Sequence, residues 1–308
     1  MNPLRALVLV LIAGFVVLWL RAPSRPKTAF AYLRWVALAC AAALIVAPFL
    51  WLVAAAFKDR EVLNEYIFFP PLPWTDKTMN LENFRRLFAG DPSVQGKVYF
   101  WQYVLNSLFV TTTITVLQMV FCSAAGFALA KYDFRGKKPL MTFMLGSMMI
   151  PSVLLLAPLY EMIVKLGLVD TYSSLFLPYL AVPYGIFLFR QSMLSIPNEM
   201  LDAGRIDGAS EFYIYLRLVM PLVRPMCAAF CLVTFLGNWN AFFGPSIFLH
   251  TQDKLTLPVI LNLYLGLYRA DYGIFLAGTL IAILPPAILF FALEKEFIGG
   301  LTSGAVKG

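Results

Sequence analysis

Long stretches without a charged side chain dominate this chain. Six of them hold between 18 and 27 residues each, and they run over 35–57, 104–130, 139–160, 172–189, 226–249 and 272–293. A helix needs about 20 residues to cross roughly 30 Å of hydrocarbon, so each stretch is long enough to cross once. The apolar runs are continuous, whereas the strands of a membrane barrel alternate in polarity. The pattern therefore predicts an all-α, polytopic membrane bundle with a six-helix core.

A shorter apolar stretch, 6–20, precedes this core. Its 15 residues lie between Arg5 and Arg21, and Arg25 and Lys27 follow directly. We interpret it as a retained extra N-terminal span, because no small-residue cleavage pattern separates it from these basic residues. A processed leader and an interfacial helix are the alternatives. We accordingly expect an extra hydrophobic segment with a basic linker over 1–30 and a membrane domain over 31–308.

The composition is that of a chain whose outer face meets lipid. Hydrophobic residues make up 60% of the chain and charged residues 13%, and the mean hydropathy is +0.77. Soluble domains carry about 25% charged residues. These values exclude a soluble cytosolic enzyme, a disordered tail and a disulfide scaffold. The four cysteines all fall in apolar stretches, where packing is their default role.

Basic residues are unevenly divided between alternate loops. The segments 21–34, 131–138, 190–225 and 294–308 carry 14 of the 24 Lys and Arg residues, together with 7 acidic residues. The opposite set carries 10 basic and 10 acidic residues, so the whole formal charge of +7 lies on one side. Because positively charged loops stay in the cytoplasm, we expect the C-terminus inside and the 58–103 loop outside.

Groups that carry out chemistry or couple to a proton gradient are missing from the six stretches. None of the stretches contains Asp, Glu, Lys or Arg, and the single histidine, His250, cannot build a metal cage by itself. The phosphate-loop pattern G-x-x-x-x-G-K-[ST] does not occur in the sequence. We therefore expect no catalytic residue, no metal site and no cofactor bound by this chain, and no nucleic-acid partner.

One polar segment, 195–224, has a distinct pattern. Pro197 can open a helix, Glu199 suits its first turn, and Gly208 interrupts it before a second amphipathic piece that ends near Pro221. Small residues allow a partner's backbone to approach, and acidic residues can pair with basic partner groups. The residues concerned are Asp202, Ala203, Gly204, Asp207 and Gly208. The alternative interpretation is an ordinary surface helix lying on the membrane.

The run 201–210, LDAGRIDGAS, followed by Met220 and Pro221, resembles the EAA loop of permease subunits in binding-protein-dependent ABC importers. It is similar to the carbohydrate-uptake branch of that family, of the maltose and glycerol-phosphate type. Asp202 stands where the family has glutamate, and Gly204 stands where it has a second alanine. Similar residues recur at 81–84, 106–107, 136–137, 239–240 and in the tail 300–308. The resemblance covers residues 30–308.

This resemblance implies a multi-pass subunit of a bacterial or archaeal cytoplasmic membrane that translocates a carbohydrate or a related polyol. It implies a second homologous permease, an ATPase dimer that carries ATP and Mg, an external solute-binding protein and membrane lipid as partners. The EAA loop would dock on the ATPases as a coupling helix, with the tail 300–308 as a second contact. ATP hydrolysis would then belong to the partner subunits. The loop 58–103 would meet the binding protein.

The alternative function is that of a secondary transporter or channel that works without an ATPase partner. Such a protein would normally display a charged site or a repeated half-helix site, and the sequence shows neither. Co-purification with an ATP-hydrolysing subunit separates the two functions.

Passage of a hydroxylated solute requires polar groups that face a cavity inside the bundle. The candidates for this substrate path are Asn238, Trp239 and Asn240 in the fifth stretch, and Asn106 and Gln118 in the second. Amides also form hydrogen bonds between membrane helices, so interhelical packing is the alternative role for these side chains.

Overall fold

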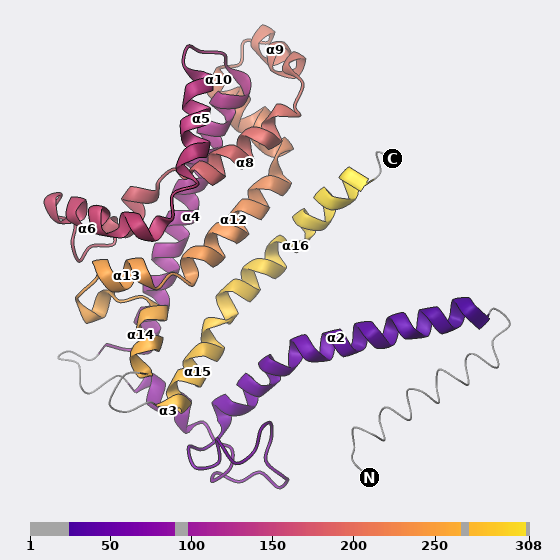
Figure 1. The fold of residues 1–308 in the computed structure, drawn as a ribbon, viewed down its shortest axis with the longest axis vertical. Helices are drawn as coiled ribbons and strands as arrows, with labels where there is room; N and C mark the ends of the chain where they lie inside the picture. Colours follow the sequence, from indigo (N-terminus) through magenta and orange to yellow (C-terminus); the bar gives the residue numbers. More distant parts are fainter. Residues whose placement is uncertain (1–24, 90–97, 266–270, 306–308) are drawn as a thin grey trace. The chain divides into compact units, whose positions relative to one another are not determined.

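The computed structural model describes residues 25–89, 98–265 and 271–305. Every regular element in these ranges is helical, which confirms the all-α prediction (Figure 1). The chain divides into two compact units, Met1–Leu81 and Glu82–Gly308. The apolar stretch 6–20 lies outside the described residues, so the extra N-terminal span stays a prediction.

The first unit contains α2 (Arg25–Phe57), a helix of 33 residues whose most apolar 18-residue window is not buried, although Ala54, Ala55 and Ala56 near its C-terminus are. At about 1.5 Å per residue it is long enough to cross a membrane. The segment 58–81 that follows consists of turns and irregular structure. Lys58 is buried in this segment, and its ammonium group donates hydrogen bonds to the carbonyl oxygens of Tyr66 and Ile67. These hydrogen bonds compensate for the free-energy cost of burying the charged ammonium group.

In the second unit, α4 (Phe100–Lys131) is the central helix. It packs against α8 (Pro183–Leu194) and α12 (Arg224–Trp239), and α12 packs against α16 (Leu284–Ala305). Figure 1 shows these helices running side by side. An apolar cluster that includes Cys122, Phe189 and Phe230 fills the space between α4, α8 and α12.

A second apolar cluster occupies the other half of this unit. Here α15 (Tyr272–Ala282) packs against α3 (Glu82–Phe88) and α14 (Leu257–Tyr264). Val110 and Phe248 are among the side chains buried in this cluster. The sixth apolar stretch corresponds to α15 and the first part of α16, which together are long and apolar enough to cross a membrane.

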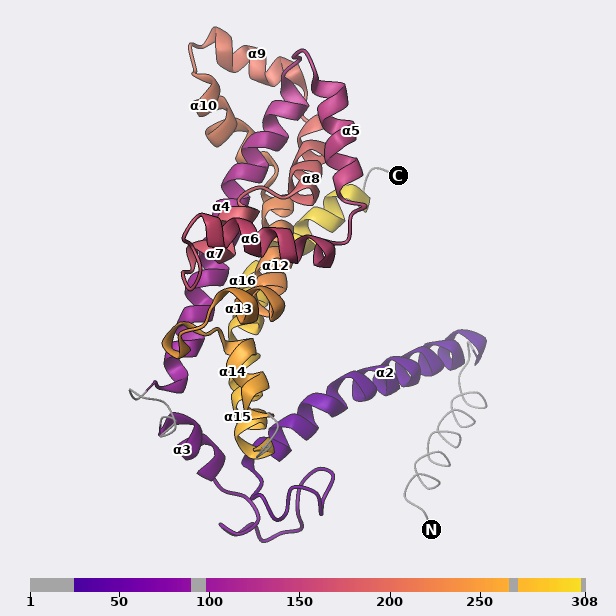
Figure 2. The same ribbon diagram turned by 60° about the vertical axis from the view of Figure 1, so that its left-hand side comes forward.

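The third stretch is broken rather than straight. A bend of 97° separates α5 (Lys137–Ser147) from the continuous pair η1 (Ser152–Leu155) and α6 (Leu156–Lys165). Pro151 lies at the break, where its missing amide hydrogen cannot continue the helical ladder. Figure 2 shows α6 crossing the direction of α5.

The fourth and fifth stretches are interrupted as well. The fourth bends by 46° between α7 (Ser173–Phe176) with η2 (Leu177–Tyr179) and α8. In the fifth, α12 ends at Trp239 and the short α13 (Phe243–Phe248) follows. In the described part of the chain, three helices are long and apolar enough to cross by themselves, and up to six spans result if each bent pair counts as one.

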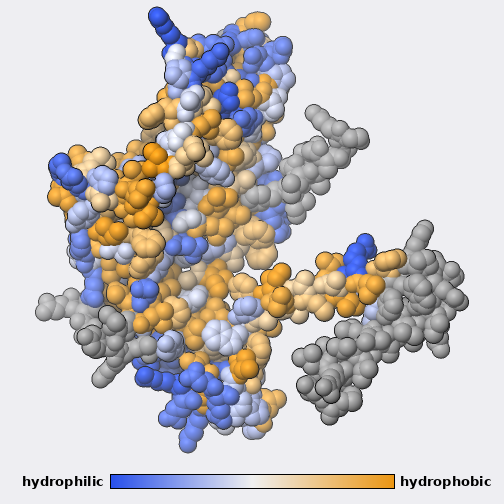
Figure 3. Space-filling view, in the orientation of Figure 1, coloured by the Kyte–Doolittle hydropathy of each residue, from blue (hydrophilic) through white to orange (hydrophobic). Residues whose placement is uncertain are grey.

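Loops that the charge distribution predicts on one side also contact one another in the second unit. At one end, Lys131 donates to Asn198 at 3.1 Å, and Arg224 pairs with Glu296 at 3.1 Å. At the other end, Arg86 pairs with Asp271. Figure 3 shows hydrophilic residues over α9 (Asn198–Ile206) and α10 (Glu211–Tyr213), and hydrophobic residues over the middle of the helices. The side of the membrane that each end faces stays a prediction.

Candidate functional site

The first candidate site is the EAA-like segment, which folds as the two short helical pieces that the sequence predicts. Helix α9 starts after Pro197, whose extended backbone precedes the first turn, and it carries Glu199 there. Gly208, at φ +81°, ends the helix in the left-handed region, where the N–H of Ala209 donates to the carbonyl of Gly204 at 3.0 Å. A glycine just past the last helical turn is the residue that this conformation favours.

The two glycines of this segment have different surroundings. A Cβ atom on Gly204 would lie 3.0 Å from Leu218 and 3.4 Å from Ile214, both on η3 (Ile214–Val219). A Cβ atom on Gly208 would meet no atom within 4 Å. Gly204 therefore serves the packing of α9 on η3, which corrects the expectation that it belongs to an open surface. Ala203 and Gly208 remain exposed.

Two acidic groups of the segment, Asp202 and Glu211, are held by Arg205 of the same segment. Arg205 Nη1 donates to Asp202 Oδ1 at 2.7 Å, and Arg205 Nε donates to Glu211 Oε1 at 2.7 Å. Tyr132, which follows the last residue of α4, donates its hydroxyl to Glu211 as well. Hydrogen bonds from Arg205 and Tyr132 lower the pKa of Glu211 below its ordinary value. The network keeps this carboxylate ionised and ties α10 to α4.

Other residues predicted at this site lie around the network. Glu199 and Asp207 are exposed on α9 and at its C-terminal cap, and Pro221 is exposed on α11 (Met220–Leu222). Arg205, Glu211 and Tyr132 were not among the residues predicted for this site. Asp202 and Arg205 are three residues apart, a spacing that indicates an ion pair on one face of a helix. The hydrogen bond between Tyr132 and Glu211 joins residues 79 apart, so no local sequence pattern indicates it.

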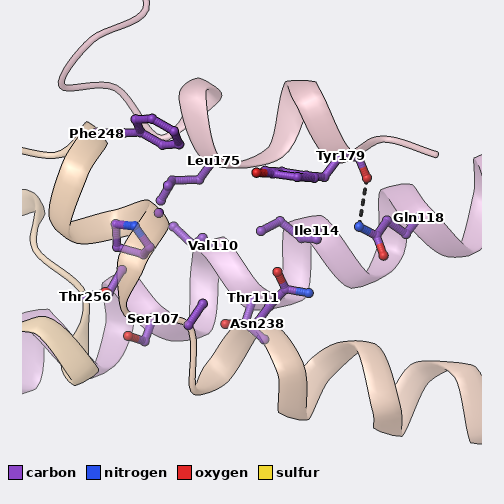
Figure 4. Close-up of a pocket in the computed structure, with 13 residues that line it drawn as sticks. Ser107, Val110, Thr111, Ile114, Gln118, Leu175, Tyr179, Asn238, Phe248 and Thr256 are labelled. Atoms are coloured by element: carbon purple, nitrogen blue, oxygen red, sulfur yellow. Dashed lines mark hydrogen bonds between the residues drawn. The ribbon is translucent and has the colours of Figure 1, made fainter. Parts of the chain in front are cut away.

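The second candidate site is a cavity of about 200 Å³ between α4, α7 with η2, and the connection from α12 to α14. Figure 4 shows that several elements contribute to the wall of this cavity, where hydroxyl and amide groups lie among apolar side chains. It is lined by Ser107, Val110, Thr111, Ile114, Gln118, Leu175, Tyr179, Asn238, Ala241, Gly244, Pro245, Phe248 and Thr256. None of these side chains carries a formal charge, so the cavity suits a neutral polar molecule.

Of the five side chains predicted for the substrate path, Gln118 and Asn238 line the cavity. The structure places the other three elsewhere. Trp239 is buried, and its indole N–H donates to the carbonyl of Ala282 at 3.0 Å. Asn240 is exposed, and Asn106 donates to the carbonyl oxygens of Asp253 and Leu255 at 2.7 and 3.0 Å.

The Ser and Thr hydroxyl groups of the cavity were not among the predicted residues. Ser107 Oγ accepts the backbone N–H of Leu257 at 2.7 Å, where α14 begins. Thr256 is only 4% exposed, and its hydroxyl has no hydrogen-bond partner among the described residues. A buried hydroxyl without a partner is costly, so this group favours a polar ligand or water in the cavity. Single Ser and Thr residues offer little sequence signal.

The described residues contain no group of three or more His, Cys, Asp or Glu side chains that could hold a metal ion. The expectation that this chain binds no metal or cofactor stays a prediction.

Comparisons with known proteins place the chain in a family. Residues 122–294 match the family described as "Binding-protein-dependent transport system inner membrane component". The chain is 37% identical over 266 residues to the arabinooligosaccharides transport system permease protein AraQ of Halalkalibacterium halodurans, covering 86% of this chain and 92% of the relative. It is 28% identical to the trehalose/maltose transport system permease protein MalG of Thermococcus litoralis, over 85% of this chain and 91% of that protein.

A solved structure supports the same fold. A bacterial ABC transporter involved in the import of the acidic polysaccharide alginate matches with a TM-score of 0.74 and 20% identity, over 90% of this chain and 99% of the matched one. At this identity the likeness bears on the fold alone. The family match over more than half of the sequence and the 37% identity to AraQ establish the assignment. The chain belongs to the inner-membrane permease components of binding-protein-dependent transport systems.

Proposed function

We propose that this permease carries a neutral carbohydrate through the cavity between α4, η2 and α12, driven by ATPases that bind the EAA-like segment. The main observation behind this proposal is that hydroxyl and amide side chains line the cavity and no charged side chain does. Sugars exchange hydrogen bonds with water for hydrogen bonds with protein, and aromatic rings such as Tyr179 and Phe248 offer apolar faces to them. The relatives named for arabinooligosaccharide and for trehalose and maltose transport support the same class of solute.

The size of the cavity supports a site shared with a second subunit. Ligand pockets commonly measure about 300–1,000 Å³, and the cavity here is about 200 Å³. We infer that a second homologous permease completes the passage, since one chain offers room for only part of an oligosaccharide. The segment 58–103 meets the solute-binding protein on the outer side in this arrangement.

The EAA-like segment transmits the movement of the ATPases to the bundle. The Asp202–Arg205–Glu211–Tyr132 network makes α9, α10 and the end of α4 one connected body. Ser123 on α4 and Tyr215 on η3, which directly follows α10, add a hydrogen bond of 2.6 Å. A rigid-body shift of α9 is therefore passed to α4, which lines the cavity. The C-terminus faces the cytoplasm, and the tail 300–308 provides a second contact with the ATPases.

Two observations disfavour a transporter or channel that works by itself. Family membership assigns the chain to transport systems that depend on a binding protein. The cavity also lacks the charged side chain that a site coupled to an ion gradient normally displays. ATP hydrolysis belongs to the partner subunits in this proposal.

The experiment is solute uptake by vesicles that contain either this chain alone or the chain with its second permease, ATPases and binding protein. We expect uphill uptake of labelled arabino-oligosaccharide or maltose only by the complete system with ATP. Uphill uptake by this chain alone contradicts the ATPase-driven mechanism. Uptake of charged solutes with exclusion of all neutral carbohydrates contradicts the assignment of the cavity.

A further inference from the structure

The turn between α6 and α7 contains Asp170, the non-glycine residue with a positive φ, +57°, in the described part of the chain. Side chains that carry a Cβ atom seldom adopt this left-handed conformation, although Asp and Asn tolerate it better than most. The structure around Asp170 holds it there through contacts with one distant segment, 248–254.

The hydrogen bonds of Asp170 all reach that segment. Its carboxylate Oδ1 accepts the backbone N–H groups of His250 and Thr251 at 2.9 and 3.0 Å. Its Oδ2 accepts the Thr251 hydroxyl and the ammonium group of Lys254, the latter at 2.9 Å. The main chain adds two bonds, since Asp170 N–H donates to Phe248 at 2.8 Å and Lys254 donates to the Asp170 carbonyl at 2.7 Å.

Both segments joined by Asp170 continue into walls of the cavity. After Asp170 the chain enters α7 and η2, which provide Leu175 and Tyr179. The segment on the other side provides Phe248 and leads directly to Thr256. Side chains separated by about 70 residues in sequence therefore face one cavity only while these two segments are held together.

A second tether acts on the same segment from α4. Asn106 donates to the carbonyl oxygens of Asp253 and Leu255. These two bonds hold the end of the segment next to Leu255, whereas the bonds of Asp170 alone reach Phe248, His250 and Thr251. Substituting Asp170 should therefore loosen the segment locally while Asn106 keeps the connection from unfolding.

We propose that Asp170 is a positioning residue for transport, whose carboxylate holds the segment 248–254 against the start of α7 so that the cavity retains its shape for the solute. This inference rests on the proposed function of the cavity. Asp170 does not itself line the cavity, so it acts through the placement of Phe248. Loss of the tether should weaken the apparent affinity of the permease for its solute more than it slows the ATPase-driven step.

The test compares Asp170→Asn with the wild type in the complete reconstituted importer. Asparagine tolerates the positive φ but removes the charge and replaces one acceptor oxygen with a donor group. We expect the half-saturating solute concentration to rise about tenfold, with the maximal rate within about twofold, because hydrogen bonds to charged groups are among the stronger ones. A fall in maximal rate with unchanged half-saturation, or wild-type values of both, overturns the proposal.

Two further variants separate positioning from general damage. Lys254→Met leaves the backbone donors in place, so we expect a smaller rise in half-saturation, about threefold. It also keeps the proposal testable if Asp170→Asn does not assemble. Glu161→Gln removes an exposed carboxylate paired with Lys165 at 2.6 Å on the neighbouring α6 and is the matched control. A rise in half-saturation for Glu161→Gln equal to that for Asp170→Asn overturns a specific role.

Hydrogen exchange gives a readout that does not depend on solute identity. In the detergent-solubilised complex, we expect the amides of His250 and Thr251 to exchange about tenfold faster in Asp170→Asn than in the wild type. Unchanged exchange overturns the tether even if the solute is misassigned. Faster exchange in a complex that transports no carbohydrate would instead retain the tether and reject the proposed function.

Discussion

The side-chain amide of Gln118 donates a hydrogen bond of 2.8 Å to the carbonyl oxygen of Tyr179 (Figure 4). Tyr179 is the last residue of η2, just before the break that separates η2 from α8. Carbonyl groups at such a break lack the helical donors that would follow in an unbroken helix. Gln118 therefore joins α4 to the bend of the fourth stretch and faces the cavity at the same time.

Gln118→Leu should disturb this junction without removing bulk from α4. We expect transport to fall severalfold, because the Tyr179 carbonyl loses its donor in a low-dielectric interior, where an unpaired group costs about 1–3 kcal/mol. The measurement is uptake normalised to assembled complex. Thr112→Val, on an exposed face of α4, is the matched control and should transport normally. Equal uptake by Gln118→Leu and the control would show that the hydrogen bond is dispensable.

Gly208→Leu tests the elbow of the EAA-like segment. The backbone at φ +81° disfavours any β-carbon by about 1–2 kcal/mol, although the site has space for a side chain. We expect normal membrane insertion but weaker ATPase attachment, measured by co-purification. Gly208→Asn should be affected less because asparagine accepts this conformation. Gly146→Ala adds a Cβ atom in open space within α5 and should have no effect. Full coupling in Gly208→Leu would reject the docking role.

Asp202→Lys tests whether this carboxylate meets a partner. Exposed ion pairs such as Asp202–Arg205 contribute little stability, so the fold of α9 should survive the change. A strong loss of ATPase attachment would then report on a basic group of the partner and not on the folding of α9. Asp133→Lys, which breaks the exposed pair with Lys137, is the control. Unchanged attachment and transport in Asp202→Lys would show that Asp202 serves only its pair with Arg205.

The pH dependence of the tether follows from the surroundings of Asp170. Burial by itself raises the pKa of this carboxyl group, but hydrogen bonds from Thr251, His250 and Lys254 outweigh it and lower the pKa well below its ordinary value. The stabilisation is present above the unfolded pKa of about 3.9 and is lost as the pH falls through the lower folded pKa. We expect the backbone amides of 248–254 to keep their protection from hydrogen exchange between about pH 7 and pH 5, because the Asp170 carboxylate stays ionised in that range. Loss of protection within that range would contradict this environment.

Sequence patterning predicted a good part of this protein. Continuous apolar stretches and the deficit of charge required a helical membrane bundle, because backbone groups in lipid must be satisfied within a helix. The run 201–210 indicated the family, which the comparisons established. Gly208 was correctly expected to interrupt its helix, since a local conformational requirement can be read from a single residue type.

The cavity was predicted less completely, and Gln118 and Trp239 show why. Both are polar groups in apolar stretches, yet Gln118 faces the cavity while the indole of Trp239 bonds to Ala282 on the neighbouring α15. Periodicity along one helix does not reveal which of its faces meets a cavity and which meets another helix, because that depends on how the helices pack.

Local sequence determined the helices, their interruptions and the likeness of the EAA-like segment to its family, because apolar runs, prolines and glycines act within a few residues. Tertiary structure decided which side chains share a site. Gly204 proved to be a packing contact for η3, and Asp170 proved to be the tether of a segment about 80 residues away. Hydrogen bonds and close contacts across such distances arise from the path of the folded chain, which no single stretch of sequence contains.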